Sequence, residues 1–596
     1  MSAAILAFGA ASSLGVGEAA FDVGGAGAAP GDGWSERRGG KPFARVSALE
    51  APPAERPLAL LELGLGQVLS GLTARVPNWQ SLRLGVAIGT SSGGFAALER
   101  ALAGQPVDAA RCAYFSPLSA LARLLPRAPE RLASIYAACA SSTIAMGLGL
   151  RWLELGDVDV ALVGGYDAES EWVCAGFDAL KATSRGRPHP FRAERDGMAL
   201  GEGVALLALG RPDRPALGYV NGFAASTDAV HITAPDRTGQ ALARAVAQAL
   251  GDAALPPERV DFVSVHGTGT SFNDAAEGAA LKLVFGPRAN ALHLHAFKSV
   301  VGHTLGAAGA LESLAVLSAF RRGVRPASAS VGEPMPELPA RLTAQNEAAE
   351  VEDCLKLSTA FGGANAALVL SRRRAAAPPV RGRAVHVAAV GARVTTLDVA
   401  RVAPLLVCSP ERLPRSDELS ELCVAAAAEV LGIAAEGAVP LERVRVGVVV
   451  GTASASLQAD VEFGARILAR GLEHAEPRRF PATSPNACAG HVAIAFGLGG
   501  PSHTVGAGAG AATEALQVAR DWLRAGDADA MLVVAAEHAG EGARVVLDAL
   551  GVALPNGARA LLLTAEPFGP RLAQDQEFAH FVGSELTSGA ARLPQS

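Results

Sequence analysis

The sequence predicts a layered α/β fold, because strand-like and helix-like segments alternate along nearly the whole chain. Short β-branched or apolar runs are each followed by Ala- and Leu-rich stretches, a pattern typical of strands packed between helices. The clearest strands are predicted at residues 84–89, 158–164 and 260–266, and another at the apolar residues 1–9. With 596 residues, 50% of them apolar, the chain is long enough for more than one large core.

The composition argues against several classes of protein. A net charge of -6, with 18% charged residues, offers no electrostatic footprint for nucleic acid or an anionic membrane. The seven cysteines lack the close pairing of a metal site and the density of a disulfide scaffold, so a reducing cytoplasm is expected. No run of about 18 apolar residues is free of charged or turn residues, so no membrane span is predicted.

A break in composition divides the chain in two. Residues 371–383 are rich in Arg and Pro and lack the periodic pattern of the flanking sequence, as expected of a linker. We therefore predict a first domain at residues 1–372, a linker at 373–383 and a second domain at 384–596.

An internal repeat relates the two domains. Trp152 and Asp157 recur, with their neighbours, as Trp522 and Asp527, each displaced by 370 positions. Upstream, residues 446–452 are similar to residues 84–90. An ordered set of this kind indicates duplication rather than chance.

Cys139 lies between an apolar strand and a helix. The unpaired N–H groups and positive dipole end of a helix N-terminus favour thiolate over thiol, so this position predicts a nucleophile near neutral pH. The small residues 140–142 leave room for a thioester. A buried, inert cysteine is the simpler interpretation of Cys112, Cys174 and Cys354.

Two histidine motifs and a Gly-rich turn follow Cys139. His266-Gly-Thr-Gly-Thr and Lys298-Ser-Val-Val-Gly-His303 each begin where a predicted strand ends, and such ends gather active groups in α/β folds. Phe361-Gly-Gly-Ala-Asn365 could present a backbone N–H group to an oxyanion. Lys298 is one of only five lysines in an Arg-rich chain.

These motifs, in this order, resemble the Cys-His-His β-ketoacyl synthases of fatty-acid and polyketide assembly. The segment Pro190–Gly203 also matches the stretch that this family carries between the cysteine and the first histidine. The resemblance covers residues 1–372. It implies a thiolase-like five-layer α-β-α-β-α fold for the first domain and a half-size thiolase-like α/β fold for the second.

The resemblance also implies a decarboxylative Claisen condensation. Cys139 would take an acyl group from the phosphopantetheine arm of acyl carrier protein, and malonyl-acyl carrier protein would then lose carbon dioxide and attack it. No metal and no cofactor bound by the chain itself is expected. The implied site comprises catalytic Cys139, His266, His303 and Lys298, oxyanion-hole and gating groups at Cys139 and Phe361, substrate-binding Thr268 and Thr270, and supporting Asp274, Glu277 and Asn365.

Three departures from the family pattern leave the substrate open. The segment from Thr90 to Cys139, which helps to shape the acyl pocket in the family, is shorter than its counterpart from Thr452 to Ala509. Ala137 stands where the family usually has Thr, and Ala360 stands where it usually has Gly before the gating Phe. Thiolases are disfavoured because a second reactive cysteine motif is lacking, and Cys-His-Asn synthases because both histidine motifs are present. A synthase-like acyltransferase without decarboxylation and a noncatalytic carrier-protein scaffold remain alternatives.

The second domain resembles half a synthase without its nucleophile. The displacement of 370 places Ala509 opposite Cys139, and none of the later motifs follows it. Such a copy resembles a chain-length factor, so we expect it to dock on the first domain as an intramolecular stand-in for a second subunit, with homo-oligomers also possible. Whether the pathway makes fatty acids, polyenes or other polyketides stays open.

Overall fold

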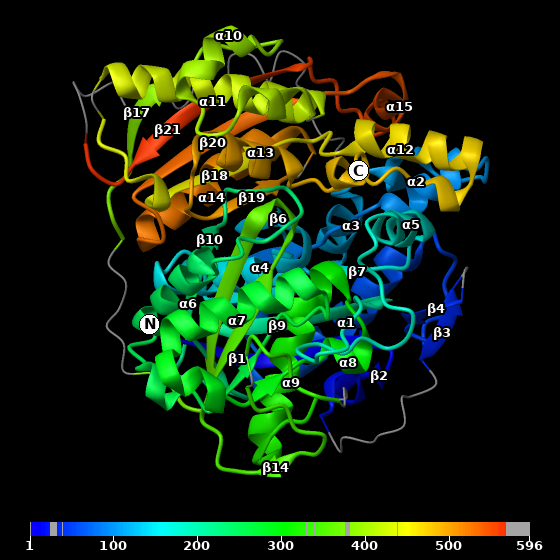
Figure 1. Cartoon of the computed structure of the whole chain (residues 1–596), viewed down its shortest axis with the longest axis vertical. Helices are drawn as coiled ribbons and strands as arrows, with labels where there is room; N and C mark the ends of the chain where they lie inside the picture. Colours follow the sequence, from blue (N-terminus) through cyan, green and yellow to red (C-terminus); the bar gives the residue numbers. More distant parts are fainter. Residues whose placement is uncertain are drawn as a thin grey trace.

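The computed structural model describes residues 2–23, 33–37, 40–328, 332–338, 340–375, 382–415, 417–437, 439–506 and 508–567. Within these residues a single sheet of 16 strands runs through the molecule. In Figure 1 the blue-to-green first part of the chain and the yellow-to-red second part lie at opposite ends, with helices covering the strands of both. The predicted layered α/β fold is confirmed.

The helices and strands up to residue 371 form the first part of the chain. Its strands are β1 Ala3–Ser12, β2 Gly15–Val16, β3 Trp34–Arg37, β4 Lys41–Ala44, β5 Leu84–Gly89, β6 Arg131–Tyr136, β7 Val160–Asp167, β8 Leu200–Gly201, β9 Gly203–Gly210, β10 Tyr219–Thr227, β11 Phe262–Ser264, β12 Leu294–His295, β13 Val324–Arg325, β14 Glu347–Ala348, β15 Asp353–Thr359 and β16 Ala364–Ser371. Its helices are α1 Arg56–Arg75, α2 Phe95–Leu102, α3 Ser116–Leu124, α4 Ser141–Glu154, α5 Glu171–Ala179, α6 Gln240–Asp252, α7 Ser271–Phe285, α8 Lys298–Val301 and α9 Ala308–Arg322.

The second part of the chain is about half as large. Its strands are β17 His386–Val390, β18 Val446–Gly451, β19 Ser502–Val505, β20 Ala530–Glu537 and β21 Gly557–Thr564, and its helices are α10 Val399–Val402, α11 Glu418–Glu436, α12 Leu457–Arg470, α13 Ala487–Phe496, α14 Ala511–Ala525 and α15 Glu541–Ala549. The strands predicted at residues 1–9, 84–89, 158–164 and 260–266 are found as β1, β5, β7 and β11. The predicted linker lies partly outside the described residues, at 376–381.

One strand order occurs three times in the sheet. The three sets are β1-β9-β7-β5-β6, β10-β16-β15-β11-β12 and β17-β21-β20-β18-β19. In each set the strand that comes first in the sequence is followed across the sheet by the fifth, fourth, second and third. In each set the fourth strand across the sheet, which is β5, β11 or β18, is parallel to both neighbours. The repeat seen in the sequence therefore corresponds to a repeat of topology.

Two helices at the centre of the first part directly follow predicted catalytic residues in the sequence. Every residue of α4 is buried, as are residues 308–320 of α9. Helices that are apolar on all sides belong between layers rather than at the surface. Because α4 follows Cys139 and α9 follows His303, this central layer fixes both residues.

Helix α1 is the one described helix that is long and apolar enough to cross a membrane by length and composition. It packs along β1 and β9, with one face buried. A core helix of a large α/β protein has the same composition.

The two parts of the chain meet through the strand that precedes Cys139. β6 pairs antiparallel with β19, with Tyr136 opposite Thr504. Arg131 forms an ion pair with Asp521 across this junction. Further ion pairs join Arg151 to Asp527 and Arg524 to Asp157, both at 2.7 Å.

Candidate active site

Cys139 lies in a tight turn between β6 and α4. Ala138 has a φ of 46°, a left-handed conformation that is uncommon for residues other than glycine and is typical of functional turns. The Ser141 hydroxyl holds the turn, because it accepts a hydrogen bond from the Ala137 N–H group (2.9 Å) and donates to the Ala138 carbonyl (2.6 Å). The turn thus presents the thiol at the end of the strand.

The structure brings both predicted histidines to this thiol. His303 Nε2 lies 3.0 Å from Cys139 Sγ, and the His266 and His303 rings lie 5.3 Å apart and nearly perpendicular. One ring nitrogen from each histidine and the sulfur all lie within 4.8 Å of one another. Residues far apart in the sequence therefore converge on one reacting position.

The burial of Cys139 opposes the thiolate that a helix N-terminus would favour. Burial raises the pKa of the Cys139 thiol to about 12, and the charge of Lys298 and the backbone N–H group of Cys139 offset this only in part. The thiol is 9% exposed, and loss of hydration penalises a buried thiolate more than the helix terminus stabilises it. The resting group is the neutral thiol.

Both histidines are neutral hydrogen-bond donors. Burial, followed by the charge of Lys298, lowers the pKa of His266 and of His303 well below the usual value. The Leu305 N–H group donates to His303 Nδ1 at 3.2 Å, which assigns the proton of the neutral ring to Nε2, the atom beside the sulfur. Lys298 Nζ lies 3.4 Å from His266 Nδ1, and since an ammonium only donates, the same tautomer follows.

Lys298 is buried between His266 and helix α9. Its Nζ donates to the His266 carbonyl at 2.7 Å and to Glu312 Oε1 at 2.5 Å. Glu312 is itself buried on α9. Lys298 therefore fixes the position of His266 and adds a charge near both rings.

Two buried carboxyl groups support the His266 loop from behind. Glu277 accepts from the backbone N–H groups of His266 (2.5 Å) and Gly267 (2.9 Å), and Asp274 accepts from that of Gly269 (3.2 Å). Burial raises the pKa of Glu277 to about 7 and that of Asp274 to about 6. Glu277 is therefore a buried acid that holds the His266 loop, not a solvated one at the surface of α7.

Thr268 and Thr270 lie on the same loop with their hydroxyl oxygens 2.9 Å apart. Thr268 is buried and Thr270 is half-buried. The contact of this pair with a substrate arm stays a prediction.

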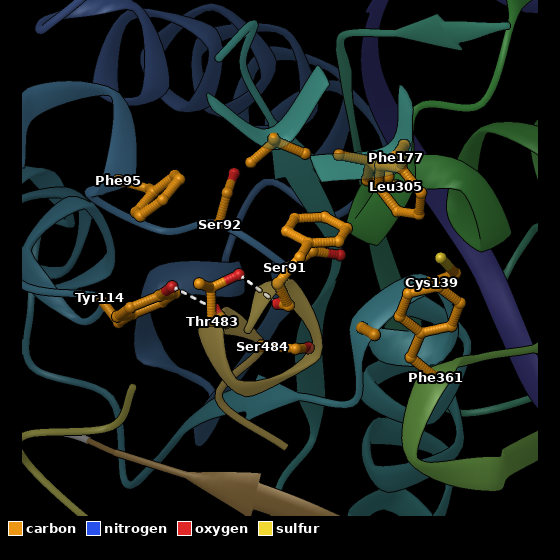
Figure 2. A pocket seen from close by; sticks show the side chains of 13 residues that line it. Ser91, Ser92, Phe95, Tyr114, Cys139, Phe177, Leu305, Phe361, Thr483 and Ser484 are labelled. Carbon is orange, nitrogen blue, oxygen red and sulfur yellow. Dashed lines mark hydrogen bonds between the residues drawn. The ribbon is translucent and has the colours of Figure 1, made fainter. Parts of the chain in front are cut away.

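Phe361 begins the Gly-rich turn, with Gly362 and Gly363 at φ values of 81° and 77°. Its ring centroid lies 5.6 Å from that of Phe177, and Figure 2 shows the ring beside Cys139. The Phe361 carbonyl accepts from Asn486 Nδ2 at 2.8 Å. Asn365 closes the turn, since its Nδ2 donates to the Gly363 carbonyl and to Asp228.

A small cavity of about 40 Å³ opens beside Cys139. Figure 2 shows that its wall includes Tyr114 and Phe177 from the first part of the chain and Thr483 and Ser484 from the second. The Tyr114 hydroxyl donates to the Thr483 carbonyl at 2.9 Å. The cavity is largely apolar, as an acyl chain requires.

Sequence reasoning missed several residues of this site. Glu312 could have been found as the lone acid in an apolar helix, and Lys356 as a rare lysine. Asp167 is buried and accepts from the Thr90 hydroxyl and the Gly306 N–H group. The wall residue Phe480 had no signal, because it comes from the second part of the chain.

The chain matches two family descriptions. The description "Beta-ketoacyl synthase, N-terminal domain" matches residues 131–214 and 380–564, and "Beta-ketoacyl synthase, C-terminal domain" matches residues 217–332. The chain is 33% identical to nodulation protein E of Rhizobium meliloti over 321 residues, which are 51% of this chain and 78% of that protein. It is 33% identical to the tetracenomycin polyketide synthase ketoacyl synthase alpha subunit of Streptomyces glaucescens, over 51% of this chain and 77% of that protein.

Two solved structures are similar. A ketosynthase in complex with its chain length factor, from Xenorhabdus doucetiae, has a TM-score of 0.55 at 28% identity and covers 62% of this chain and 98% of its own. The PfaC keto synthase–chain length factor has a TM-score of 0.71 at 17% identity and covers 94% of this chain and 78% of its own. That second likeness extends the thiolase-like fold over both parts of the chain.

The chain belongs to the β-ketoacyl synthase family. It is a condensing enzyme of the kind that serves fatty-acid and polyketide biosynthesis, with the acyltransferase activity of that class.

Proposed function

We propose that Cys139 carries the growing acyl group and that the site extends it with a malonyl unit held on acyl carrier protein. One observation carries this proposal. Two neutral imidazoles, from His266 and His303, each bring a ring nitrogen close to Cys139 Sγ. The contacts at their Nδ1 atoms leave Nε2–H as the donor of each ring. Paired neutral donors suit an enolate oxygen, which gains negative charge as carbon dioxide leaves.

The first stage is thioester exchange. The Cys139 sulfur forms a bond to the acyl carbon, the bond to the phosphopantetheine sulfur breaks, and the thiol proton ends on the released phosphopantetheine thiol. The backbone N–H groups of Cys139 and Phe361 would stabilise the oxyanion of the tetrahedral intermediate. Thr268 and Thr270 would hydrogen-bond the arm.

The second stage is condensation. The malonyl carboxylate leaves as carbon dioxide, and the electron pair of the broken C–C bond becomes an enolate that His266 and His303 stabilise. The nucleophilic carbon then attacks the acyl-Cys139 carbon, the bond from that carbon to sulfur breaks, and the released Cys139 thiolate takes up a proton from solvent to restore the thiol. The product is a β-ketoacyl-acyl carrier protein, and no cofactor held by the chain takes part.

The proposal extends to residues 384–596, which would occupy the place of a second subunit. The pairing of β6 with β19 supports this pseudo-dimer, as does the complex of a ketosynthase with its chain length factor among the similar structures. Phe480 and Thr483 would then limit the acyl cavity from across the junction. All seven cysteines are free, which supports a reducing, cytoplasmic location.

Intact mass of the protein after incubation with an acyl-acyl carrier protein tests the first stage. We expect one acyl adduct, absent from Cys139→Ala and present in Cys408→Ala, which changes a cysteine outside the site. Release of carbon dioxide from malonyl-acyl carrier protein, with a β-ketoacyl product, tests the second stage. An adduct without carbon dioxide release would favour simple acyl transfer, and no adduct with any acyl donor would favour the scaffold.

A further inference from the structure

Lys356 is a fully buried lysine that the recognised motifs leave out. It lies on β15 with 0% exposure, and its Nζ is 2.7 Å from Glu312 Oε2. The other oxygen of the same carboxylate, Oε1, is 2.5 Å from Lys298 Nζ. One carboxylate therefore lies between two ammonium groups.

Lys356 also connects to the helix that follows the nucleophile. Its Nζ donates to the Leu357 carbonyl and, at 3.2 Å, to the Ser358 hydroxyl. The Ser358 hydroxyl lies 2.8 Å from that of Thr143, on the first turn of α4. Burying a lysine is costly, and an ion pair in the interior adds little net stability, so packing alone does not account for this residue.

The charge that Lys356 adds acts on the two histidines. Burial lowers the pKa of Lys356, and the charge of Glu312 opposes this. With Lys298 and Lys356 as cations and Glu312 as an anion, the group carries one net positive charge. The charges of both lysines lower the pKa of His266 and of His303, after burial. The other acids that face the site are Glu277 on α7 and Asp167 on β7, together with the thiol itself.

We propose that Lys356 is a positioning residue whose charge, shared with Lys298 through Glu312, keeps both histidines neutral during condensation. This role rests on the proposed function. An imidazolium at Nε2 would transfer its proton to the nucleophilic carbon formed by decarboxylation, which makes a C–H bond and leaves neutral imidazole and an acetyl thioester. Lys356 thus protects the carbanion from protonation and keeps decarboxylation coupled to condensation.

The test compares three variants with different net charge in this group. Lys356→Met gives zero, Glu312→Gln gives two positive charges, and the double variant restores one. Acyl-loaded protein is supplied with malonyl-acyl carrier protein from about pH 3 to about pH 8, since both histidines titrate well below the usual range, and the ratio of β-ketoacyl product to carbon dioxide is measured. Lys282→Met, which changes an exposed lysine of α7, is the matched control.

We expect the pH at which this ratio falls by half to follow the net charge. Loss of a positive charge raises the histidine pKa, so Lys356→Met moves the midpoint up by about one pH unit, and Glu312→Gln moves it down by a similar amount. The double variant and Lys282→Met keep the wild-type midpoint. Acyl loading of Cys139 changes by no more than about threefold in Lys356→Met, since loading forms no carbanion.

Midpoints that do not change with the net charge of the group would overturn the proposal. If Lys356→Met does not fold, the shift of the midpoint in Glu312→Gln and its reversal in the double variant still test the proposal. A wild-type protein that releases no carbon dioxide would instead contradict the proposed function, so the two failures are distinguishable.

Discussion

Cys139 and Ala509 occupy equivalent turns with opposite surroundings. Cys139 is buried beside His303, whereas Ala509 is exposed at the start of α14. In the sequence no His-Gly-Thr-Gly-Thr or Lys-x-x-x-x-His motif follows Ala509. A thiol at that place would face solvent without the two imidazole donors. The second copy therefore loses no catalytic activity through the absence of the cysteine.

The raised pKa of Cys139 has a consequence for its reactivity with alkylating reagents. Because the thiol stays protonated, we expect the rate of alkylation by iodoacetamide to rise about tenfold per pH unit from about pH 6 to about pH 9.5 without a plateau. Intact mass measures the rate, with Cys139→Ala as the background. A plateau below about pH 7 would instead indicate a resting thiolate.

At the scale of elements, the gating turn of the first part rests on helix α13 of the second. Asn486 precedes α13, and its side chain holds the Phe361 carbonyl. A Cβ atom on Gly490 would lie 2.8 Å from the Cα of Gly362. This close approach leaves the turn little freedom to move without α13.

Asn486→Ala removes the hydrogen bond that holds the gate. We expect condensation to slow by about 5- to 150-fold, because an unpaired buried carbonyl costs about 1–3 kcal/mol. The rate of β-ketoacyl product formation measures this. Asn556→Ala is the control, since Asn556 bonds to Ala539 and Arg544 within the second part, and equal slowing in both variants would contradict a specific role for Asn486.

Helix α14 also contacts β6 through Glu514. This buried side chain accepts from the Ser134 N–H group at 2.6 Å, and burial raises its pKa to about 8. A carboxyl whose pKa is raised on folding binds its proton more tightly in the native state, so its contribution to stability is lost as pH rises from about 4.5 towards 8. The junction is therefore weaker in alkaline solution.

Glu514→Gln removes this dependence, because the amide keeps the acceptor oxygen without a charge. We expect it to stabilise the protein by about 1–3 kcal/mol at pH 8 and by much less at pH 5. Thermal unfolding at the two pH values measures the difference. Glu436→Gln, at an exposed position of α11, is the control, and an equal gain at both pH values would count against the assignment.

At the scale of the whole molecule, the junction satisfies groups that would otherwise be buried or left as an open strand edge. Arg151, which is 3% exposed at its side chain, pairs with Asp527 from the second part. The Trp152 indole N–H group donates to Asp521 at 2.8 Å. An unpaired β6 would be a template for association with another chain.

Light scattering tests whether the second part takes the place of a second subunit. We expect the 60.4 kDa chain to be a monomer and a chain of residues 1–383 to self-associate or aggregate, because β6 and its charged neighbours lose their partners. A chain of residues 1–383 that carries Ile135→Pro, which blocks strand pairing, should self-associate less. A tight dimer of the intact chain that survives removal of residues 384–596 would contradict this expectation.

Much of the site was predictable because its residue types lie in short motifs. Cys139, His266, Lys298 and His303 were found from sequence alone, and the structure brings them together. The state of the thiol was not predictable, since it depends on the burial of Cys139. The same holds for Asn486, whose partner is 125 positions away in the chain.

The sequence by itself determined the fold class, the order of the motifs and the repeat that ends in Ala509, because these depend on residue type and spacing along the chain. Only the tertiary structure decided the rest: the protonated thiol, the carboxylate of Glu312 between two lysines, and a cavity whose wall is shared by both parts. These features arise from burial and from contacts between distant segments, and packing alone sets both.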